Sequence, residues 1–246
     1  RFRAGKSGRS LAVYIREVKR RPWRPQITRP EAIRGWVFFA LYVGVFPLLM
    51  GAIQRGIGGE IPVAEANVLY YLVSAVLVFL VFWSFLRHGF HMILDWLPEN
   101  LFAFVTGLAG AAVLHFLVMR IPYPVENPNS YSYPEQFALS PAATVVILVI
   151  LMPIVEETLF RGLLFGCLRR YSRPLAWCLS VMAYALYCVW QFMFTWNGVD
   201  PRYLLLFVQY LPISLACTWA YDNGGSVWTP IGLHAVINLF TLVWSL

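Results

Sequence analysis

Residues 141–170 place three ionisable side chains inside a long apolar pattern, and this combination most limits what the chain can become. The pattern opens with an uncharged run at 142–155 and resumes after Glu156, Glu157 and Arg161. A charge near the centre of a bilayer costs about 3 kcal/mol on insertion scales, so three charges in one helix need partners, water or both. This stretch is therefore the candidate functional site of a membrane protein.

Helix geometry predicts how these three side chains are arranged. Glu157 and Arg161 are four residues apart and share one face, whereas Glu156 points about 100° away around the helix axis. The arginine can then hold the carboxylate of Glu157 in its ionised form. The carboxylate of Glu156 is left to face a cavity and a second helix.

The remainder of the chain has the composition of a helical membrane protein. Of its 246 residues 59% are hydrophobic and 13% charged, and the mean hydropathy is +0.64, outside the range of soluble domains. Apolar segments long enough to cross a bilayer lie at 35–53, 67–86, 101–119, 141–170, 174–196, 203–220 and 227–246. The predicted fold is all-α and polytopic, with about seven transmembrane helices.

Residues 1–34 form a basic segment that precedes the first apolar run. They hold eleven Lys or Arg and two Glu, so the net charge of +7 of the whole chain comes from this segment. Such an excess predicts a cytoplasmic N-terminus lying against an anionic leaflet, rather than a nucleic-acid-binding tail. Residues 35–246 are predicted to form one transmembrane domain, in the inner or cell membrane, because neither a repeat nor a linker divides them.

His234 in the last span is predicted to lie at the depth of the two glutamates. With the N-terminus inside, the fourth span runs inward and carries Glu156 and Glu157 about 23 Å from its outer end. The seventh span runs outward from near Ser226 and reaches His234 after about 12 Å. Asn238 follows four residues later, on the same stripe of the helix.

These groups suggest a hydrolytic site. A water held between a glutamate and His234 can be activated as a nucleophile, with Arg161 and Asn238 available to stabilise charge. A lone histidine in a membrane helix is equally often a hydrogen-bonded packing residue. Agreement in depth between two separate segments favours the functional interpretation.

Three segments of the sequence resemble the motifs of a known family. PIVEETLFRGLLFG resembles the EExxxR motif of the CPBP family of intramembrane proteases, which includes the CAAX prenyl endopeptidases and the bacterial abortive-infection-type proteins. GSVWTPIGLHAVINLF is similar to the HxxxN motif of that family. The middle motif, FxxxH, falls on SVMAYALYCV, where Tyr184 takes the Phe position and Cys188 takes the His position. The resemblance covers residues 141–246.

The resemblance implies a CPBP-like helical bundle with a conical cavity open to the cytoplasmic side. It places at the catalytic positions of the family Glu156, Glu157, Arg161, His234 and Asn238. By that analogy a glutamate and a histidine polarise a water that hydrolyses a peptide bond of a membrane-associated protein. The cofactor implied is either none or a divalent metal such as zinc.

Cys188, in place of a second imidazole, leaves two functions open. A thiol can ligate a soft metal, so Glu157, Cys188 and His234 are candidate metal ligands, although a buried inert cysteine is commoner. The first hypothesis is an active intramembrane endopeptidase. The alternative is a catalytically degenerate CPBP-like subunit that binds or scaffolds another membrane protein complex. A transporter with a Glu–Arg–His relay is a third interpretation, but no inverted repeat supports it.

Overall fold

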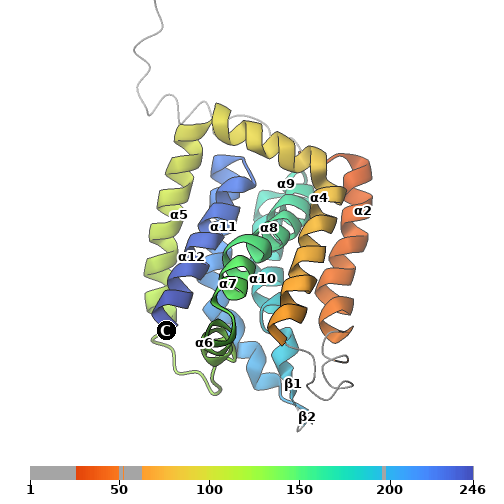
Figure 1. The fold of residues 1–246 in the computed structure, drawn as a ribbon. Helices are drawn as coiled ribbons and strands as arrows, with labels where there is room; N and C mark the ends of the chain where they lie inside the picture. Colours follow the sequence, from red (N-terminus) through yellow and green to blue (C-terminus); the bar gives the residue numbers. More distant parts are fainter. Residues whose placement is uncertain (1–25, 50–51, 53–62, 196–197, 246) are drawn as a thin grey trace, which may run out of the picture.

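The computed structural model describes residues 26–49, 52, 63–195 and 198–245. Most of these residues lie in helices that run up and down through one bundle (Figure 1). The predicted basic segment falls largely outside the described residues, since only 26–34 of it are included. The elements are α2 (Arg29–Ala40), η1 (Leu41–Val45), α4 (Val63–Asp95), α5 (Leu97–Val118), α6 (Asn129–Leu139), α7 (Pro141–Val145), η2 (Val146–Leu151), α8 (Met152–Glu157), η3 (Thr158–Phe165), α9 (Gly166–Arg169), α10 (Arg173–Tyr187), η4 (Trp190–Met193), β1 (Phe194–Thr195), β2 (Gly198–Val199), η5 (Pro201–Leu206), α11 (Phe207–Gly224) and α12 (Trp228–Ser245).

The all-α, polytopic membrane fold predicted from the sequence is confirmed. Five helical stretches of the described residues are long and apolar enough to cross a membrane: Arg29–Leu49, Asn67–Asp95, Leu97–Val118, Pro141–Arg169 and Pro201–Gly224. The predicted spans at 174–196 and 227–246 are shorter helices, α10 with 15 residues and α12 with 18. Since a bilayer core needs about 20 helical residues, with a range of about 17–25, α10 is short for an independent span, whereas α12 lies within that range. The short strands β1 and β2 pair antiparallel beyond the end of α10.

Helix α4 bends at Phe82, where φ is −115° and ψ is 26°. Beyond the bend, residues 83–95 cross one end of the bundle before α5 descends (Figure 1). The bend interrupts the helical hydrogen bonds, and the buried carboxylate of Glu31 in α2 accepts from the amide of Phe85 at 3.1 Å. The same carboxylate completes a capping box with Thr28 at the start of α2. One acidic side chain therefore starts one helix and supports the bend of another.

Two glycines let aromatic rings of α4 approach its neighbours closely. A Cβ on Gly35 of α2 would lie 2.5 Å from the ring of Phe82, and one on Gly162 of η3 would lie 2.6 Å from the ring of Phe85. Both rings are fully buried in the main core cluster. Helices α2, α4 and η3 are thus joined at positions where no larger residue fits.

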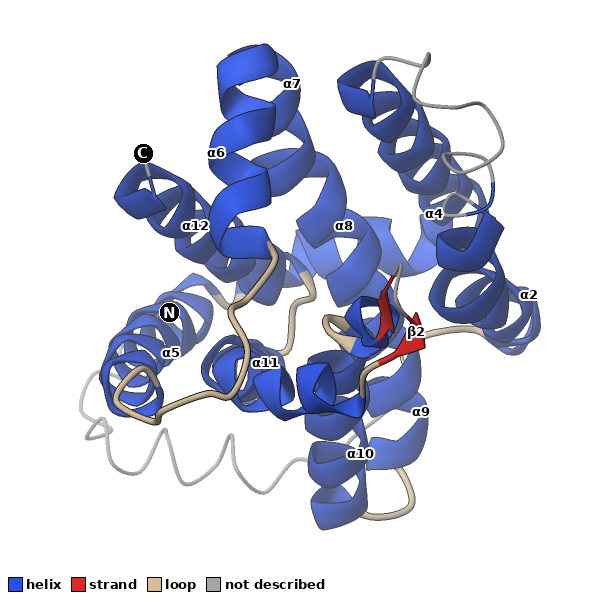
Figure 2. Ribbon diagram, turned by 90° about the horizontal axis from the view of Figure 1, so that it is seen from below, coloured by secondary structure: helices blue, strands red, loops and turns tan. Residues whose placement is uncertain are grey.

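The continuous helix Pro141–Arg169, formed by α7, η2, α8, η3 and α9, is called the motif helix below. Its α8 part lies between α4 and α12 (Figure 2), and η3 packs against α10 and α11. In its most apolar window 61% of the residues are buried inside the protein, against 17–39% in the other four span candidates. The most central helix is therefore the one that carries the three charged residues, which removes them from lipid.

Candidate functional site

The motif helix widens into π-helical turns on both sides of α8, in η2 and η3. In η2 the amide of Met152 donates to the carbonyl of Ile147, five residues back. The carbonyl of Leu148 would pair with residue 153 in the same pattern, but Pro153 has no N–H. The amide group of Asn238 supplies the missing donor, with Nδ2 2.8 Å from the oxygen of Leu148. Asn238 therefore joins α12 to the motif helix, which is a different use from the expected charge stabilisation.

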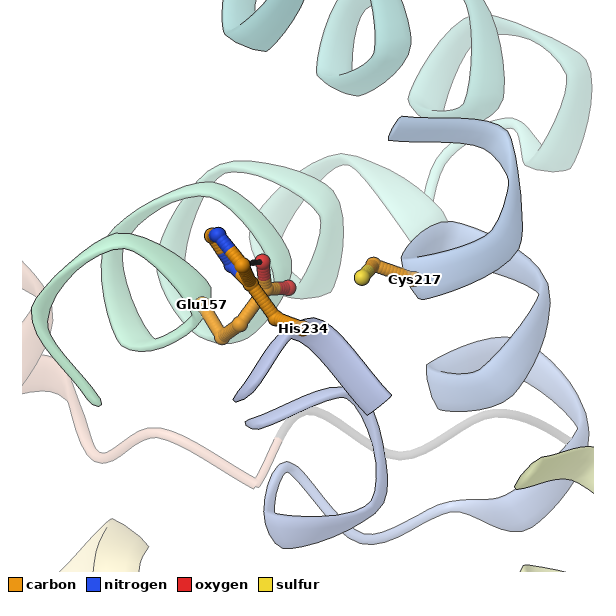
Figure 3. Close-up of side chains that lie close together, drawn as sticks. All are labelled: Glu157, Cys217 and His234. Carbon is orange, nitrogen blue, oxygen red and sulfur yellow. Dashed lines mark hydrogen bonds and ion pairs between the residues drawn. The ribbon is translucent and has the colours of Figure 1, made fainter. Parts of the chain in front are cut away.

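Glu157, Arg161 and His234 form a buried, hydrogen-bonded chain. Oε1 of Glu157 lies 3.0 Å from Nη1 of Arg161 and 2.8 Å from Nδ1 of His234. Figure 3 shows the imidazole of α12 against the carboxylate of the motif helix. The three side chains are at most 1% exposed. A neutral ring that donates from Nδ1 to this carboxylate would carry its lone pair on the other nitrogen, Nε2.

Other groups besides the carboxylate oxygen of Glu157 stabilise the buried guanidinium of Arg161. Its Nη2 donates to the carbonyl and to the hydroxyl of Ser214 in α11, each at 3.0 Å. Its Cζ lies 4.4 Å from the centre of the Tyr184 ring, in a cation–π contact. Because a buried charge is tolerated only when it is paired and hydrogen-bonded, these contacts fix the position of Arg161 and, through it, that of Glu157.

The second ring nitrogen of His234, Nε2, contacts the hydroxyl of Tyr184 and faces Glu156. Oε2 of Glu156 lies 4.0 Å from Nε2, and the hydroxyl oxygen of Tyr184 lies 3.4 Å from the same atom. A separation of 4.0 Å is too long for a direct hydrogen bond, but one water can bridge it. The two glutamates therefore play different parts: Glu157 binds the ring at Nδ1, and Glu156 lies across a gap from Nε2.

These groups are enclosed by protein in this conformation. Glu156 is 4% exposed and His234 1%, while Glu157 and Arg161 are inaccessible. A polypeptide can reach Nε2 only if neighbouring helices move apart. The open conical cavity implied by the resemblance is not the state described here.

The third side chain that approaches Glu157 and His234 is Cys217 of α11, rather than the expected Cys188. One ligand atom from each of Glu157, Cys217 and His234 lies within 4.8 Å of the others (Figure 3). Cys188 ends α10, where its amide donates to the carbonyl of Tyr184. It does not belong to this cluster of described residues.

Carboxylate, imidazole and thiolate are all donors that zinc accepts, so the fit of the cluster to a metal can be tested. Two ligands of one tetrahedral zinc are separated by about 3.3 Å, given metal–ligand bonds of about 2.0–2.1 Å. The 2.8 Å between Oε1 of Glu157 and Nδ1 of His234 is a hydrogen-bond distance. Arg161 adds a positive charge on the same oxygen. A zinc ion held by Oε1 of Glu157 and Nδ1 of His234 would therefore have to break the bond between them, whereas Oε2 of Glu157 is buried without a hydrogen-bond partner among the described residues.

Several residues at the site were not identified from the sequence as part of it. Ser214 and Cys217 in α11, and the hydroxyl of Tyr184, reach the charged groups. Within the apolar sixth span the small polar residues Ser214, Cys217 and Thr218 recur at helical spacing, and all three are buried. Such a polar stripe is a sequence signal for a helix face that meets buried charges.

Comparison with known proteins finds a family resemblance in the motif-bearing part of the chain. Residues 138–240 match the family model described as type II CAAX prenyl endopeptidase Rce1-like. A curated relative, UPF0177 protein YbdJ of Lactococcus lactis subsp. lactis, is 29% identical over 180 residues, which cover 69% of this chain and 74% of that protein. No solved structure matches. The resemblance predicted from the motifs is confirmed, since the matched residues carry those motifs.

Proposed function

We propose that the chain is an intramembrane endopeptidase, because residues 138–240 match the family model described as type II CAAX prenyl endopeptidase Rce1-like. Its substrate is a membrane-associated protein, and its nucleophile is a water activated by His234. The observation that supports this proposal best is the buried chain from Arg161 through Glu157 to Nδ1 of His234. It leaves Nε2 oriented toward a second carboxylate, that of Glu156.

Glu157 orients the imidazole in this proposal. A carboxylate hydrogen-bonded to one ring nitrogen fixes the tautomer and stabilises the imidazolium that forms when the other nitrogen takes a proton. Arg161 holds that carboxylate in place from the same helix. Glu157 is therefore a positioning residue, and His234 is the general base.

Glu156 holds the water. A water bridging Oε2 of Glu156 and Nε2 of His234 donates one hydrogen bond to each, and its oxygen lone pair is free to attack a carbonyl carbon. As the O–C bond forms, Nε2 takes the proton. When the C–N bond breaks, the same proton passes to the leaving amine, and the ring returns to its neutral state.

Tyr184 stabilises the charge that develops on the carbonyl oxygen. Its hydroxyl lies 3.4 Å from Nε2, so it is adjacent to the bridging water and able to donate to an oxyanion there. The amide of Asn238, expected in this role, is already bound to Leu148. The position that carries Phe in the family motif thus carries, in this chain, a hydroxyl beside the reacting atoms.

The test uses the full chain reconstituted with a membrane-anchored protein that bears a C-terminal CAAX tail, in prenylated and unprenylated forms. Glu156→Gln and His234→Ala are each expected to reduce cleavage at least about 100-fold, the usual contribution of acid–base catalysis. Glu126→Gln, which removes an exposed carboxylate in the loop between α5 and α6, serves as the matched control. Cleavage that persists in both site variants would show that this site does not perform the hydrolysis.

Two observations favour the degenerate subunit as a second candidate. Cys188 replaces the second imidazole of the family motif, and the site is at most 4% exposed. A scaffold subunit would bring down a stoichiometric membrane protein whose retention is unaffected by Glu156→Gln. Retention of a partner together with no cleavage of any CAAX-tailed substrate would favour this candidate over the peptidase.

The orientation in the membrane is part of the proposal. The N-terminal end of α2 lies at the same end of the bundle as the junction of α9 with α10 (Figure 1). Arg169, Arg170 and Arg173 occupy that junction, and Arg29 and Arg34 occupy the first turns of α2. The positive-inside bias supports a cytoplasmic location of this end. Reporter fusions after residue 246 should then report the opposite side, because α12 ends there.

A further inference from the structure

The part of α4 beyond its bend carries a second polar feature, remote from Glu157 and His234. A surface pocket of about 270 Å³ lies there. Its lining belongs to one face of the segment 83–95 and consists of Trp83, Ser84, Arg87, His88 and His91. We call this feature the α4 pocket. None of its residues takes part in the proposed hydrolysis.

The segment is held against the bundle through its opposite face. The hydroxyl of Ser226 donates to the carbonyl of Gly89 at 2.7 Å, and the indole N–H of Trp228 donates to the carbonyl of Leu86 at 2.9 Å. These bonds connect the segment to the loop between α11 and α12 and to the start of α12. The α4 pocket is therefore presented outward on a fixed helix rather than on a loose loop.

The exposed side of the segment is divided into an apolar and a polar stripe. Trp83, Phe90 and Leu94 recur at spacings of seven and four residues, and all are more than half exposed. Ser84, Arg87, His88 and His91 recur at spacings of three and four residues on the adjacent stripe. A helix of this kind, lying across the ends of the spans, places its apolar stripe in lipid and its polar stripe among headgroups.

The lining chemistry selects an anion. Arg87 offers a planar fork of N–H donors that matches a phosphate, while His88, His91 and Ser84 add donors, each within about one helical turn of Arg87. No carboxylate is among the lining residues. Trp83, which is 59% exposed, is of the residue type that settles at a membrane interface.

We propose that the α4 pocket binds the phosphate of an anionic phospholipid headgroup. The apolar stripe contacts the acyl chains of the same lipid, while Arg87 and the two imidazoles receive its phosphate. This site lies at the same end of the bundle as the arginines of α2 and of the α9–α10 junction. It therefore adds a specific contact to the diffuse electrostatic attraction between those arginines and anionic lipids. It does not depend on the proposed peptidase activity.

The test measures binding of phosphatidylglycerol to the full chain in mild detergent by native mass spectrometry. Arg87→Ala is expected to lower the affinity about fivefold, the equivalent of the roughly 1 kcal/mol that one basic side chain contributes near a membrane surface. The double variant His88→Ala, His91→Ala is expected to lower it further than either single change. Arg87→Lys, which keeps the charge but loses the fork, should recover only part of the loss.

Arg34→Ala is the matched control, because it removes one exposed charge from the same end of the bundle outside the pocket. An equal loss in Arg34→Ala and Arg87→Ala would overturn the proposal in favour of diffuse attraction. Inorganic phosphate and phosphatidylcholine form two further arms. Binding of free phosphate as tight as that of the lipid, or no preference over phosphatidylcholine, would overturn the assignment to an anionic headgroup.

Discussion

Nδ1 of His234 lies 2.8 Å from Oε1 of Glu157, so two segments 77 positions apart in the chain meet in a single buried hydrogen bond. The bond is made at the carboxylate that also holds Arg161, not at its neighbour Glu156. Adjacent glutamates are thereby given separate environments. One is fixed between two partners, and the other is left across a gap from Nε2.

Exchanging each glutamate for glutamine should separate these roles. Glu157→Gln removes the charge that compensates the buried Arg161, so the free energy of unfolding is expected to fall by about 3–5 kcal/mol. Glu156→Gln leaves that pair intact and is expected to cost about 1 kcal/mol or less, while cleavage is lost. Thermal unfolding followed by helical circular dichroism in detergent checks the first effect, and cleavage per folded molecule checks the second. Equal losses of stability in both variants would contradict the division of roles.

Tyr184→Phe isolates the hydroxyl beside Nε2. The ring, with its contacts to Arg161 and to His234, is retained, so stability should change by no more than about 1 kcal/mol. If the hydroxyl binds the oxyanion, kcat is expected to fall about 100-fold, the usual cost of one such donor, with KM nearly unchanged. The measurement is initial cleavage rate against substrate density in proteoliposomes. A kcat equal to that of the native chain would remove Tyr184 from the chemistry.

Sequence patterns predicted which helices and residues form the site better than they predicted which side chains contact one another. The charges inside an apolar helix, together with helix direction, placed Glu157 and His234 at one depth, and the structure brings them into contact. The bend at Phe82 was not predicted, because it depends on a carboxylate of another helix, that of Glu31. Periodicity reports which residues face inward, whereas such pairings depend on tertiary packing.

Asn238 illustrates the same limit at the site itself. Its spacing from His234 suggested a shared catalytic stripe, but its amide completes the hydrogen bonding of Leu148. That need arises from a π turn followed by Pro153, and a helix-period pattern does not reveal π turns. A buried carbonyl without a donor is costly, so a polar residue in an apolar helix can serve the backbone rather than a substrate.

Asn238→Ala is accordingly expected to act on stability. The carbonyl of Leu148 loses its donor, which should lower the free energy of unfolding by about 1–3 kcal/mol. Cleavage should fall only in proportion to the folded fraction. Thr241→Val, on the same helix, removes a hydroxyl that bonds only within its own turn and is the control. A large loss of cleavage with native stability would instead make Asn238 a catalytic residue.

A resident metal is not expected, because Oε1 of Glu157 already binds both Arg161 and Nδ1 of His234, the latter at less than the separation of two zinc ligands. Chelation of divalent ions during the cleavage assay should leave the rate within about twofold, well inside the 10–100-fold losses typical when metal sites are disturbed. Cys217→Ser, which removes the only thiol in the cluster Glu157, Cys217 and His234, should behave the same way. Loss of cleavage on chelation with recovery on added zinc would contradict this prediction. In that case, loss of zinc-dependent cleavage in Cys217→Ser would show that the thiol is a zinc ligand.

Gly162→Ala tests whether the close approach of α4 to the motif helix supports the site. The added methyl would lie 2.6 Å from the ring of Phe85 in the fully buried core, so either the ring or the helix must shift. Overpacking of this kind costs about 1–3 kcal/mol, and because Gly162 follows Arg161 directly, the shift should also reduce cleavage per folded molecule. Gly110→Ala in α5 is the matched control, since nothing lies within 4 Å of its added methyl. It should be neutral or slightly stabilising, because alanine is the better helix former. If the two variants unfold at the same temperature, the contact between Phe85 and Gly162 is looser than the structure shows, and the Glu157–Arg161 pair does not depend on it.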